Sequence, residues 1–366
     1  MKKKKIVRWV ALVVAALAAV TLFVAYVWQP APVEGYRSAY ESAYLDTPEA
    51  RFHYSRTGSG SPVVLVAGGA QWLYSYRDTI PALAREHTVY AVDLPGQGYT
   101  TVKGDFAYDI PAMARALGSF LDAAGLDTVS LVGHSWGGAW SLYYAERNPS
   151  RVDRLVLLDS PGLDKPLASQ TALFSVPVVG ELAVKLMGRA DFEKSLRTAF
   201  AHQDRVTAEV VDETWHWMSR PDKREAFVRL VRTQDYEPTD AGLAGLRART
   251  LVVWGEADQW LPAAYAQEYG RRIPGATVRI VPGAGHNVHE DAPELVNPLL
   301  ADFLRPLTGR GSTRRDDPVT CGVPCSAQGI SKPALASTSL PRRDSTRSTN
   351  RCAASPAGAL TRVAMG

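Results

Sequence analysis

Hydrophobic residues between Pro62 and Leu307 follow two patterns that alternate along the chain. Short, nearly continuous apolar runs are separated by longer stretches in which apolar residues recur at helical spacing. Such runs are typical of strands buried on both faces of a parallel sheet, and the stretches between them are typical of crossover helices. The predicted strands are 62–67, 88–92, 128–132, 154–159, 250–254 and 277–281. The pattern predicts an α/β fold with a mostly parallel, doubly wound sheet.

One long interval interrupts this alternation. From about Gly162 to Ala248, strand-like runs give way to helix-favouring stretches such as VGELAVKLMG, residues 179–188. An insertion of this length between two strands is too long for a loop, so it predicts a small helical cap over 162–248. Six large apolar side chains in it could line a pocket or form the core of the cap: Phe174, Leu186, Met187, Trp215, Trp217 and Met218.

The first 30 residues combine positive charge with a long apolar run. No charged residue occurs from Trp9 to Trp28, and 20 residues at ~1.5 Å each span roughly 30 Å, the thickness of the hydrocarbon core of a bilayer. Five cations precede the run, which favours a cytoplasmic N-terminus and an exported body. The pattern predicts an uncleaved single-pass anchor over 1–30. A cleaved signal peptide, which would leave a secreted protein, and a buried core helix are the alternatives.

The formal net charge of +4 is unevenly distributed. The first 30 residues contribute five positive charges and residues 309–366 contribute a net six, which leaves about −7 for residues 31–308. The body therefore has no excess of positive charge that would indicate nucleic-acid binding.

The position of the cap divides the predicted core into two parts, residues 31–161 and 249–308.

The C-terminal tail, 309–366, differs from the body in composition. It is rich in Ser, Thr, Arg, Pro and Ala and has no sustained periodicity, so it is predicted to be disordered. All three cysteines lie in it, at Cys321, Cys325 and Cys352. The body therefore needs no disulfide and has no thiolate with which to bind a metal.

The run GHSWG, residues 133–137, is the most specific chemical signal in the chain. It follows a predicted strand and precedes a predicted helix, which is the setting of the G-x-S-x-G turn. In that turn the serine is lifted out of the end of the sheet, and the flanking glycines allow close backbone contacts. The position predicts Ser135 as a nucleophile. A serine hydroxyl needs a neighbouring base, and the base needs an acid to orient it.

Candidates for the acid and the base follow the serine in the chain. Asp258 lies just past a predicted strand and is the predicted acid. Asp159, which ends the preceding strand, is the alternative, whereas Glu256 is expected to face solvent. Two histidines compete for the role of the base, His286 and His289.

The two histidines have different surroundings within the stretch GAGHNVHED, residues 283–291. His286 follows a glycine-flanked turn at the end of a strand, where a loop can bring an imidazole toward the serine. His289 falls in the first turn of the next helix, beside Glu290 and Asp291, whose charges suit a helix N-terminus. His286 is the predicted base, and His289 is predicted to be a packing residue.

Five motifs in this order resemble those of the α/β-hydrolase fold superfamily over about residues 50 to 305. They are VVLVAGG (63–69), VDLPGQGYT (92–100), GHSWGG (133–138), GEAD (255–258) and GAGHNVHEDAPE (283–294). The resemblance implies a capped, esterase-like serine hydrolase with a catalytic triad of Ser135, Asp258 and His286. It implies no metal and no organic cofactor.

The backbone groups that would stabilise an oxyanion also follow from the fold. One N–H comes from the residue after the nucleophile, Trp136, and one from the loop after the first long strand, where Gly69 is the candidate and Ala70 stands behind it. The sequence departs from the family pattern at two histidine positions, which are Ala67 and Gln97 here. Neither position belongs to the predicted triad.

The expected reaction is hydrolysis of a small or medium apolar ester through an acyl-enzyme. The expected partners are this small-molecule substrate and, through the N-terminal helix, a membrane. A proline-type aminopeptidase and a C–C bond hydrolase are alternatives on the same fold. The alternative outside enzymes is a protein that binds a ligand beneath the cap without turning it over.

Overall fold

The computed structural model describes residues 2–33, 42–165 and 171–305. The predicted disordered tail, with its three cysteines, lies outside the described residues.

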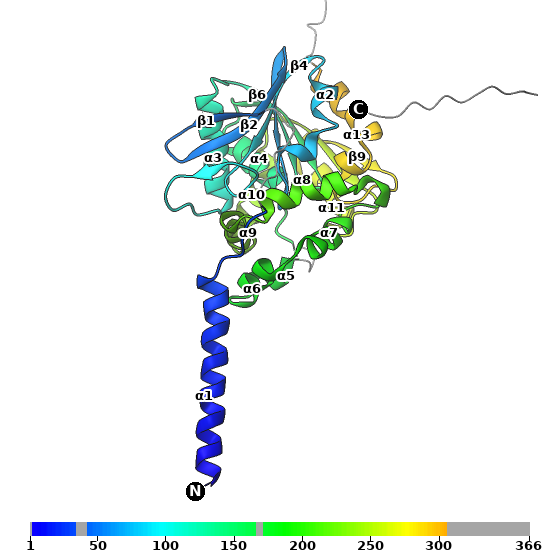
Figure 1. The fold of residues 1–366 in the computed structure, drawn as a ribbon. Coiled ribbons are helices and arrows are strands. Elements are labelled where there is room, and N and C mark those ends of the chain that lie inside the picture. Colours follow the sequence, from blue (N-terminus) through cyan, green and yellow to red (C-terminus); the bar gives the residue numbers. More distant parts are fainter. Residues whose placement is uncertain (1, 34–41, 166–170, 306–366) are drawn as a thin grey trace, which may run out of the picture. The chain divides into compact units, whose positions relative to one another are not determined.

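A nine-stranded sheet forms the centre of the body (Figure 1). Its strands are β1 Ala43–Asp46, β2 Ala50–Gly58, β3 Ser61–Val66, β4 His87–Asp93, β5 Thr101–Val102, β6 Val129–His134, β7 Val152–Leu158, β8 Arg249–Gly255 and β9 Thr277–Val281. Their order is β1-β2-β4-β3-β6-β7-β8-β9, and β5 pairs with β2. Neighbours from β4 to β9 are parallel, so the predicted mostly parallel sheet is confirmed.

All six predicted strands are present, and their ends agree with the prediction to within two residues. The strands that the hydrophobic pattern missed are β1, β2 and β5, which pair antiparallel at one edge. In β2 buried residues are mixed with exposed ones, including Arg51 and Arg56. Such a strand lacks the continuous apolar run that marks a strand covered on both faces.

Helices cover both faces of the sheet (Figure 1). In β7, Leu155 and Leu157 belong to one hydrophobic cluster, whereas Val156 and Leu158 belong to the other. This alternation follows from the two-residue period of a strand. The helices of the core are α2 Ile80–Leu83, α3 Ile110–Ala123, α4 Trp136–Arg147, α11 Ala264–Arg272, α12 Val288–Asp291 and α13 Pro293–Leu304, together with a 3-10 turn, η2, at Leu73–Tyr76. Residues of α3, α4 and α11 contribute to the first cluster, and residues of α2 and α13 to the second.

Helices fill the described part of the interval between β7 and β8, where the cap is predicted. They are α5 Ala172–Ser175, α6 Val179–Leu186, α7 Arg189–Arg197, α8 Ala208–Met218, α9 Pro221–Thr233 and α10 Glu237–Gly242, with 3-10 turns η4 Gln203–Arg205 and η5 Leu243–Gly245. α6 packs against α9, and α7 packs against α8. Figure 1 shows these helices grouped together in green. The limits of the cap as a domain stay a prediction.

The N-terminal apolar run forms a helix, α1 Lys2–Leu22, which continues as a π-helical turn, η1 Phe23–Val27. Among the described residues, this is the one helix that is both long enough and apolar enough to cross a membrane. Its large apolar side chains are exposed, so it is not a core helix of the body. An anchor and a signal sequence share these properties.

Candidate active site

The predicted site residues meet at the carboxyl ends of adjacent strands. Ser135 follows β6, Asp159 follows β7, Asp258 lies just past β8 and His286 lies past β9. The loop that carries Gly69 follows β3, the neighbour of β6. The chain leaves β3 toward β4 on one side, whereas β6 leads to β7 on the other, so the site lies at a switch point of the sheet, where ligands bind in open α/β folds.

Ser135 occupies a strained backbone turn between β6 and α4. Its φ is 47° and its ψ is −126°, in a region that few residues with a side chain adopt. The flanking glycines have no room for a side chain. A Cβ on Gly133 would lie 2.5 Å from the carbonyl oxygen of Gly137, and one on Gly137 would lie 2.3 Å from that of Val66. These contacts explain why the turn has glycine at both positions.

The side chains of Ser135, His286 and Asp258 form one chain of hydrogen-bonding groups. His286 Nε2 lies 3.1 Å from Ser135 Oγ, and His286 Nδ1 lies 2.9 Å from Asp258 Oδ2. The other carboxylate oxygen of Asp258 accepts backbone N–H groups from Trp260 at 2.7 Å and Leu261 at 3.0 Å. With Nδ1–H facing the carboxylate, Nε2 is free to accept the serine proton.

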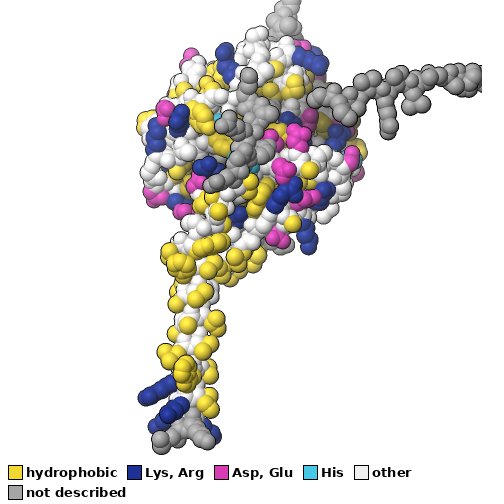
Figure 2. Space-filling model, viewed as in Figure 1, with side chains coloured by type: hydrophobic (Ala, Val, Ile, Leu, Met, Phe, Trp, Pro, Cys, Tyr) yellow, Lys and Arg dark blue, Asp and Glu magenta, His cyan; other side chains and the backbone are white. Residues whose placement is uncertain are grey.

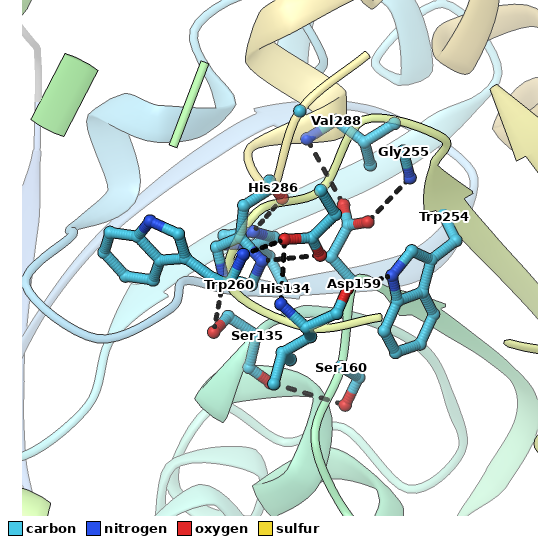
Figure 3. A network of polar contacts seen from close by, with 12 residues as sticks. His134, Ser135, Asp159, Ser160, Trp254, Gly255, Trp260, His286 and Val288 are labelled. Carbon is cyan, nitrogen blue, oxygen red and sulfur yellow. Dashed lines mark hydrogen bonds and ion pairs between the residues drawn. The ribbon is translucent and has the colours of Figure 1, made fainter. Parts of the chain in front are cut away.

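Asp159, the alternative acid, has different partners. Its Oδ1 accepts the backbone N–H of Gly255 at 2.7 Å, and its Oδ2 accepts that of Val288 at 3.3 Å (Figure 3). Burial, with the nearby charge of Asp258, raises the pKa of Asp159 well above its usual range. Asp159 therefore ties the end of β8 to the segment that follows His286. Glu256 is exposed, as expected.

The two candidate oxyanion donors lie in the pocket that Ser135 and His286 also line. Trp136 is the first residue of α4, so its N–H has no acceptor within the helix. Gly69 packs on the indole of Trp136: a Cβ at Gly69 would lie 2.5 Å from a ring carbon. Ala70 lines the same pocket.

Comparison with known proteins identifies the family of the chain. A family model described as the alpha/beta hydrolase fold matches residues 61–293. The chain belongs to the alpha/beta hydrolase family.

Several relatives of this hydrolase are named for the cleavage of dienoates. It is 27% identical, over 268 residues, to a 2-hydroxy-6-oxo-6-phenylhexa-2,4-dienoate hydrolase of Burkholderia cepacia, a match that covers 69% of this chain and 91% of the relative. It is 30% identical, over 258 residues, to a 2-hydroxy-6-oxo-2,4-heptadienoate hydrolase of Pseudomonas putida, covering 68% of this chain and 90% of the relative. Its fold resembles the meta-cleavage product hydrolase of Pseudomonas fluorescens IP01, with a TM-score of 0.61, 22% identity, and coverage of 69% and 94%.

Two glutamines hold the hydrolase loop that carries Gly69, and the sequence reasoning did not predict their role. Gln97 Nε2 donates to the carbonyl oxygens of Ala67 and Gly68, both at 2.8 Å. Gln71 Oε1 accepts the N–H of Gly68 at 3.2 Å. Gln97 stands where the family motif has a histidine, and this departure is the feature of the sequence that could have indicated its role. Ala67 is fully buried, so a larger side chain there would overpack the core.

Two further histidines lie behind the base. The Nε2–H of His134 donates to the carbonyl oxygen of His286 at 3.0 Å. The ring of His289 lies 4.6 Å from that of His134 and 4.7 Å from that of Tyr76. Burial, and to a smaller extent the charge of Arg77, lowers the pKa of His289 to about 3. Within the described residues neither nitrogen of His289 has a hydrogen-bond partner, so it packs as a neutral ring.

The acidic residues Glu290 and Asp291 lie in the first turn of α12, as predicted, and both are buried. Glu290 is buried in an ion pair with Arg77. Asp291 is also fully buried, and its Oδ2 accepts the N–H groups of Gly285 at 2.7 Å and Ala201 at 3.0 Å. Ala201 belongs to the cap region and Gly285 directly precedes the base. Asp291 therefore links the cap to the loop that carries His286.

The pocket above Ser135 is apolar. It has a volume of about 1010 Å³, its open mouth included, and none of its described lining residues carries a formal charge if the histidines are neutral. Of the six apolar cap candidates, Phe174, Met187 and Met218 line it. Trp215 and Trp217 are buried within the protein, whereas Leu186 is 64% exposed and neither lines the pocket nor joins the core. Within the described residues no cluster of His, Cys, Asp and Glu could hold a metal ion.

Proposed function

We propose that this α/β hydrolase is a serine hydrolase that cleaves small or medium apolar esters through an acyl-enzyme. The observation that carries the proposal is the hydrogen-bonded series Ser135, His286 and Asp258 at the base of an uncharged pocket. A nucleophile, a base within reach of its proton and an acid that orients the base are the groups that acyl transfer by a Ser-His-Asp triad requires.

The mechanism follows from these contacts. Ser135 Oγ attacks the ester carbonyl carbon while its proton moves to His286 Nε2, and Asp258 stabilises the imidazolium. The oxyanion accepts hydrogen bonds from the N–H groups of Trp136 and Gly69. The C–O bond then breaks, and His286 gives its proton to the leaving oxygen, which departs as an alcohol. Water attacks the acyl-enzyme in the same way, its proton passes through His286 to Ser135 Oγ, and the carboxylic acid is released. Loss of one oxyanion donor costs ~10²- to 10³-fold in rate.

The character of the pocket favours a neutral substrate. A buried carboxylate requires a cation or several hydrogen-bond donors, because desolvation of the charge is otherwise too costly. The described lining residues include neither lysine nor arginine. An uncharged ester therefore matches this pocket better than an anionic acid does.

A C–C bond hydrolase is the second candidate, and the relatives favour it. Two of them, at 27% and 30% identity, are named as hydrolases of 2-hydroxy-6-oxo dienoates. The polar side chains of Gln71 and Asn287 line the pocket and could contact a substrate carboxylate or enol. The same serine and histidine would then act on a ketone carbonyl.

A fluorophosphonate probe tests the nucleophile in the full chain. Wild type should be labelled, and Ser135→Ala should not. Ser195→Ala is the matched control, because Ser195 lines the same pocket but lies outside the hydrogen-bonded series, so this variant should label like wild type. If folded wild type remains unlabelled, the enzyme proposal fails, and a protein that binds a ligand without turnover replaces it.

A substrate panel separates the two reactions. We expect p-nitrophenyl esters to have a higher kcat/KM than 2-hydroxy-6-oxo-6-phenylhexa-2,4-dienoate, with proline p-nitroanilide included to test for aminopeptidase activity. A higher kcat/KM for the dienoate would replace the ester proposal with C–C hydrolysis.

For the N-terminal helix, we infer an uncleaved anchor with the hydrolase body outside. The support is the length of α1 and η1, the exposure of their apolar side chains and the lysines at the N-terminal end of α1. Cations on one flank of an apolar helix favour retention of that flank in the cytoplasm.

A further inference from the structure

Helix α6 of the cap presents an apolar face outward. The side chains of Val179, Leu182, Ala183 and Leu186 recur at positions i, i+3, i+4 and i+7 and therefore share one face. Val179 is 41% exposed and Leu186 is 64% exposed. The neighbouring Val184 is buried. The apolar face of α6 is thus exposed at Val179 and Leu186, with Leu182 and Ala183 half-buried between them.

Helix α5, which packs against α6, extends this apolar surface. Its Leu173 is 52% exposed, and Val176, the next residue after the helix, is 47% exposed. We call Leu173, Val176, Val179 and Leu186 the cap patch. Figure 2 shows hydrophobic side chains gathered over this part of the cap. A contiguous surface of large aliphatic side chains marks a site of interaction with another apolar body.

The cap patch borders the pocket of the candidate active site. Phe174 directly follows Leu173, and Met187 directly follows Leu186. Both Phe174 and Met187 line the pocket that contains Ser135. Whatever covers the patch therefore lies next to the side chains that lead to the nucleophile.

The patch also lies next to the end of the apolar N-terminal helix. The turn η1 packs against α6, and Lys185 Nζ donates to the carbonyl oxygen of Trp28 at 2.8 Å. If α1 crosses a bilayer, the chain enters water at about Trp28, beside α6. The stretch from there to β1 at Ala43 reaches at most ~50 Å when fully extended, so the body stays close to the lipid surface in any case.

We propose that the cap patch docks on the bilayer that α1 crosses, and that apolar substrates pass from the lipid, past Phe174 and Met187, to Ser135. The docking part rests on the proposed anchor, and the entry part rests on the proposed ester hydrolysis. A bilayer is favoured over a partner protein because the N-terminal helix supplies a lipid surface within reach, and because the patch is aliphatic.

Docking is tested with a fluorophore in the full chain. The variant Leu186→Cys, with Cys321, Cys325 and Cys352 replaced by serine, is labelled with NBD and placed, one chain per disc, in nanodiscs of phosphatidylethanolamine and phosphatidylglycerol. We expect blue-shifted emission that doxyl lipids quench. Leu295→Cys is the control, because Leu295 is 48% exposed on α13 and lies outside the patch, so its label should report water.

Two outcomes would overturn docking. Water-like emission at position 186 would show that lipid does not cover the patch. Blue-shifted emission without quenching by doxyl lipids would show that protein covers it. Neither readout depends on turnover, so failure of the ester proposal would not be mistaken for failure of docking.

Entry from the lipid is tested by kinetics in the same discs. The double variant Leu173→Ser and Leu186→Ser is compared with Leu295→Ser on p-nitrophenyl decanoate, a medium-chain ester that partitions into the bilayer, and on p-nitrophenyl butyrate, which stays largely in water. We expect the double variant to lose roughly tenfold in kcat/KM for the decanoate alone, because two apolar anchors are removed. An equal loss for both esters, or for neither, would overturn the entry route.

Discussion

At the scale of single residues, the imidazole of His286 is held from three directions. Asp258 fixes Nδ1, the ring of Trp260 stacks on the imidazole with centroids 5.0 Å apart and an interplanar angle of 18°, and His134 binds its backbone carbonyl. A base held in this way needs little reorganisation when it accepts a proton. Asp258 is the member of this group whose charge faces the ring.

The two candidate acids give a matched pair of variants. Asp258→Asn keeps the size of the side chain but removes the charge, and the ring tautomer that it favours is wrong for catalysis, so kcat should fall by ~10³- to 10⁴-fold. Asp159→Asn should lower kcat much less, because Asp159 contacts backbone N–H groups and not His286. Steady-state ester hydrolysis, with circular dichroism to check folding, measures both. A larger loss of kcat in Asp159→Asn than in Asp258→Asn would identify Asp159 as the catalytic acid in place of Asp258.

The lowered pKa of His289 predicts that the free energy of unfolding depends on pH. Its folded-state pKa of about 3 lies below the ordinary value of 6.5, so the unfolded chain binds a proton at this site between those two values and the folded chain does not. The contribution of His289 to stability is therefore fully present above about pH 6.5 and falls as pH drops toward 3.

The variant His289→Met removes this titration while it keeps the ring's place filled with an apolar side chain. Urea unfolding at pH 7 and pH 4.5 should show a smaller loss of unfolding free energy for His289→Met than for wild type, and ester turnover at pH 7 should be largely retained. His286→Ala, by contrast, should abolish turnover. Equal losses of stability in variant and wild type would contradict the buried, neutral assignment of His289.

The sequence indicated some of these residues better than others. Ser135, Asp258 and His286 each follow a strand in a motif of fixed order, and the structure brings them together; their catalytic roles stay predictions until tested. Trp260 and His134 carry no such signal, because their contacts with His286 depend on how segments distant in the sequence pack together.

At the scale of elements, continuous apolar runs located the central strands, because those strands are covered on both faces. Helical periodicity also indicated a cap, but it does not tell which face of a helix points inward. Leu186 illustrates the difference: its spacing fits a core position, yet its side chain is exposed. The same ambiguity applies to Asp291: its charge suits a helix N-terminus, but the sequence does not show that its carboxylate is buried.

Asp291 provides a test of how the cap is attached. Asp291→Ala leaves the N–H groups of Gly285, Ala201 and His202 without their carboxylate acceptor. The N–H of Gly285 is buried, and a buried N–H left unpaired costs ~1–3 kcal/mol, whereas Ala201 and His202 are exposed and can bond to water. We expect the free energy of unfolding to fall by about 2 kcal/mol, and kcat to fall by ~10-fold or more because the loop of His286 is displaced.

The control for this variant is Asp105→Ala, since the side chain of Asp105 is 88% exposed and pairs with one arginine at the surface. Its unfolding free energy should change by no more than ~0.5 kcal/mol. Chemical denaturation followed by tryptophan fluorescence compares the two. A wild-type midpoint in Asp291→Ala would show that the cap does not depend on this carboxylate.

At the scale of the whole molecule, the proposed location of the hydrolase rests on the N-terminal helix. Hydropathy located the helix with little ambiguity, but the same pattern serves an anchor and a signal peptide. The difference lies in whether a peptidase removes the segment, and no contact within the folded chain determines that. The prediction therefore has to be tested on the protein made in a bacterial cell.

We expect the full chain to stay in the membrane fraction after an alkaline carbonate wash, and intact-mass analysis to find residues 1–30 still attached. Val13→Arg with Leu17→Arg places two charges near the middle of α1, and each costs about 2.5–3.5 kcal/mol at that depth. This variant should appear in the soluble fraction with its length unchanged. A wild-type protein that is soluble and lacks the first 30 residues would identify a signal peptide; the cap patch would then face water, and the proposed lipid route to Ser135 would fail with it.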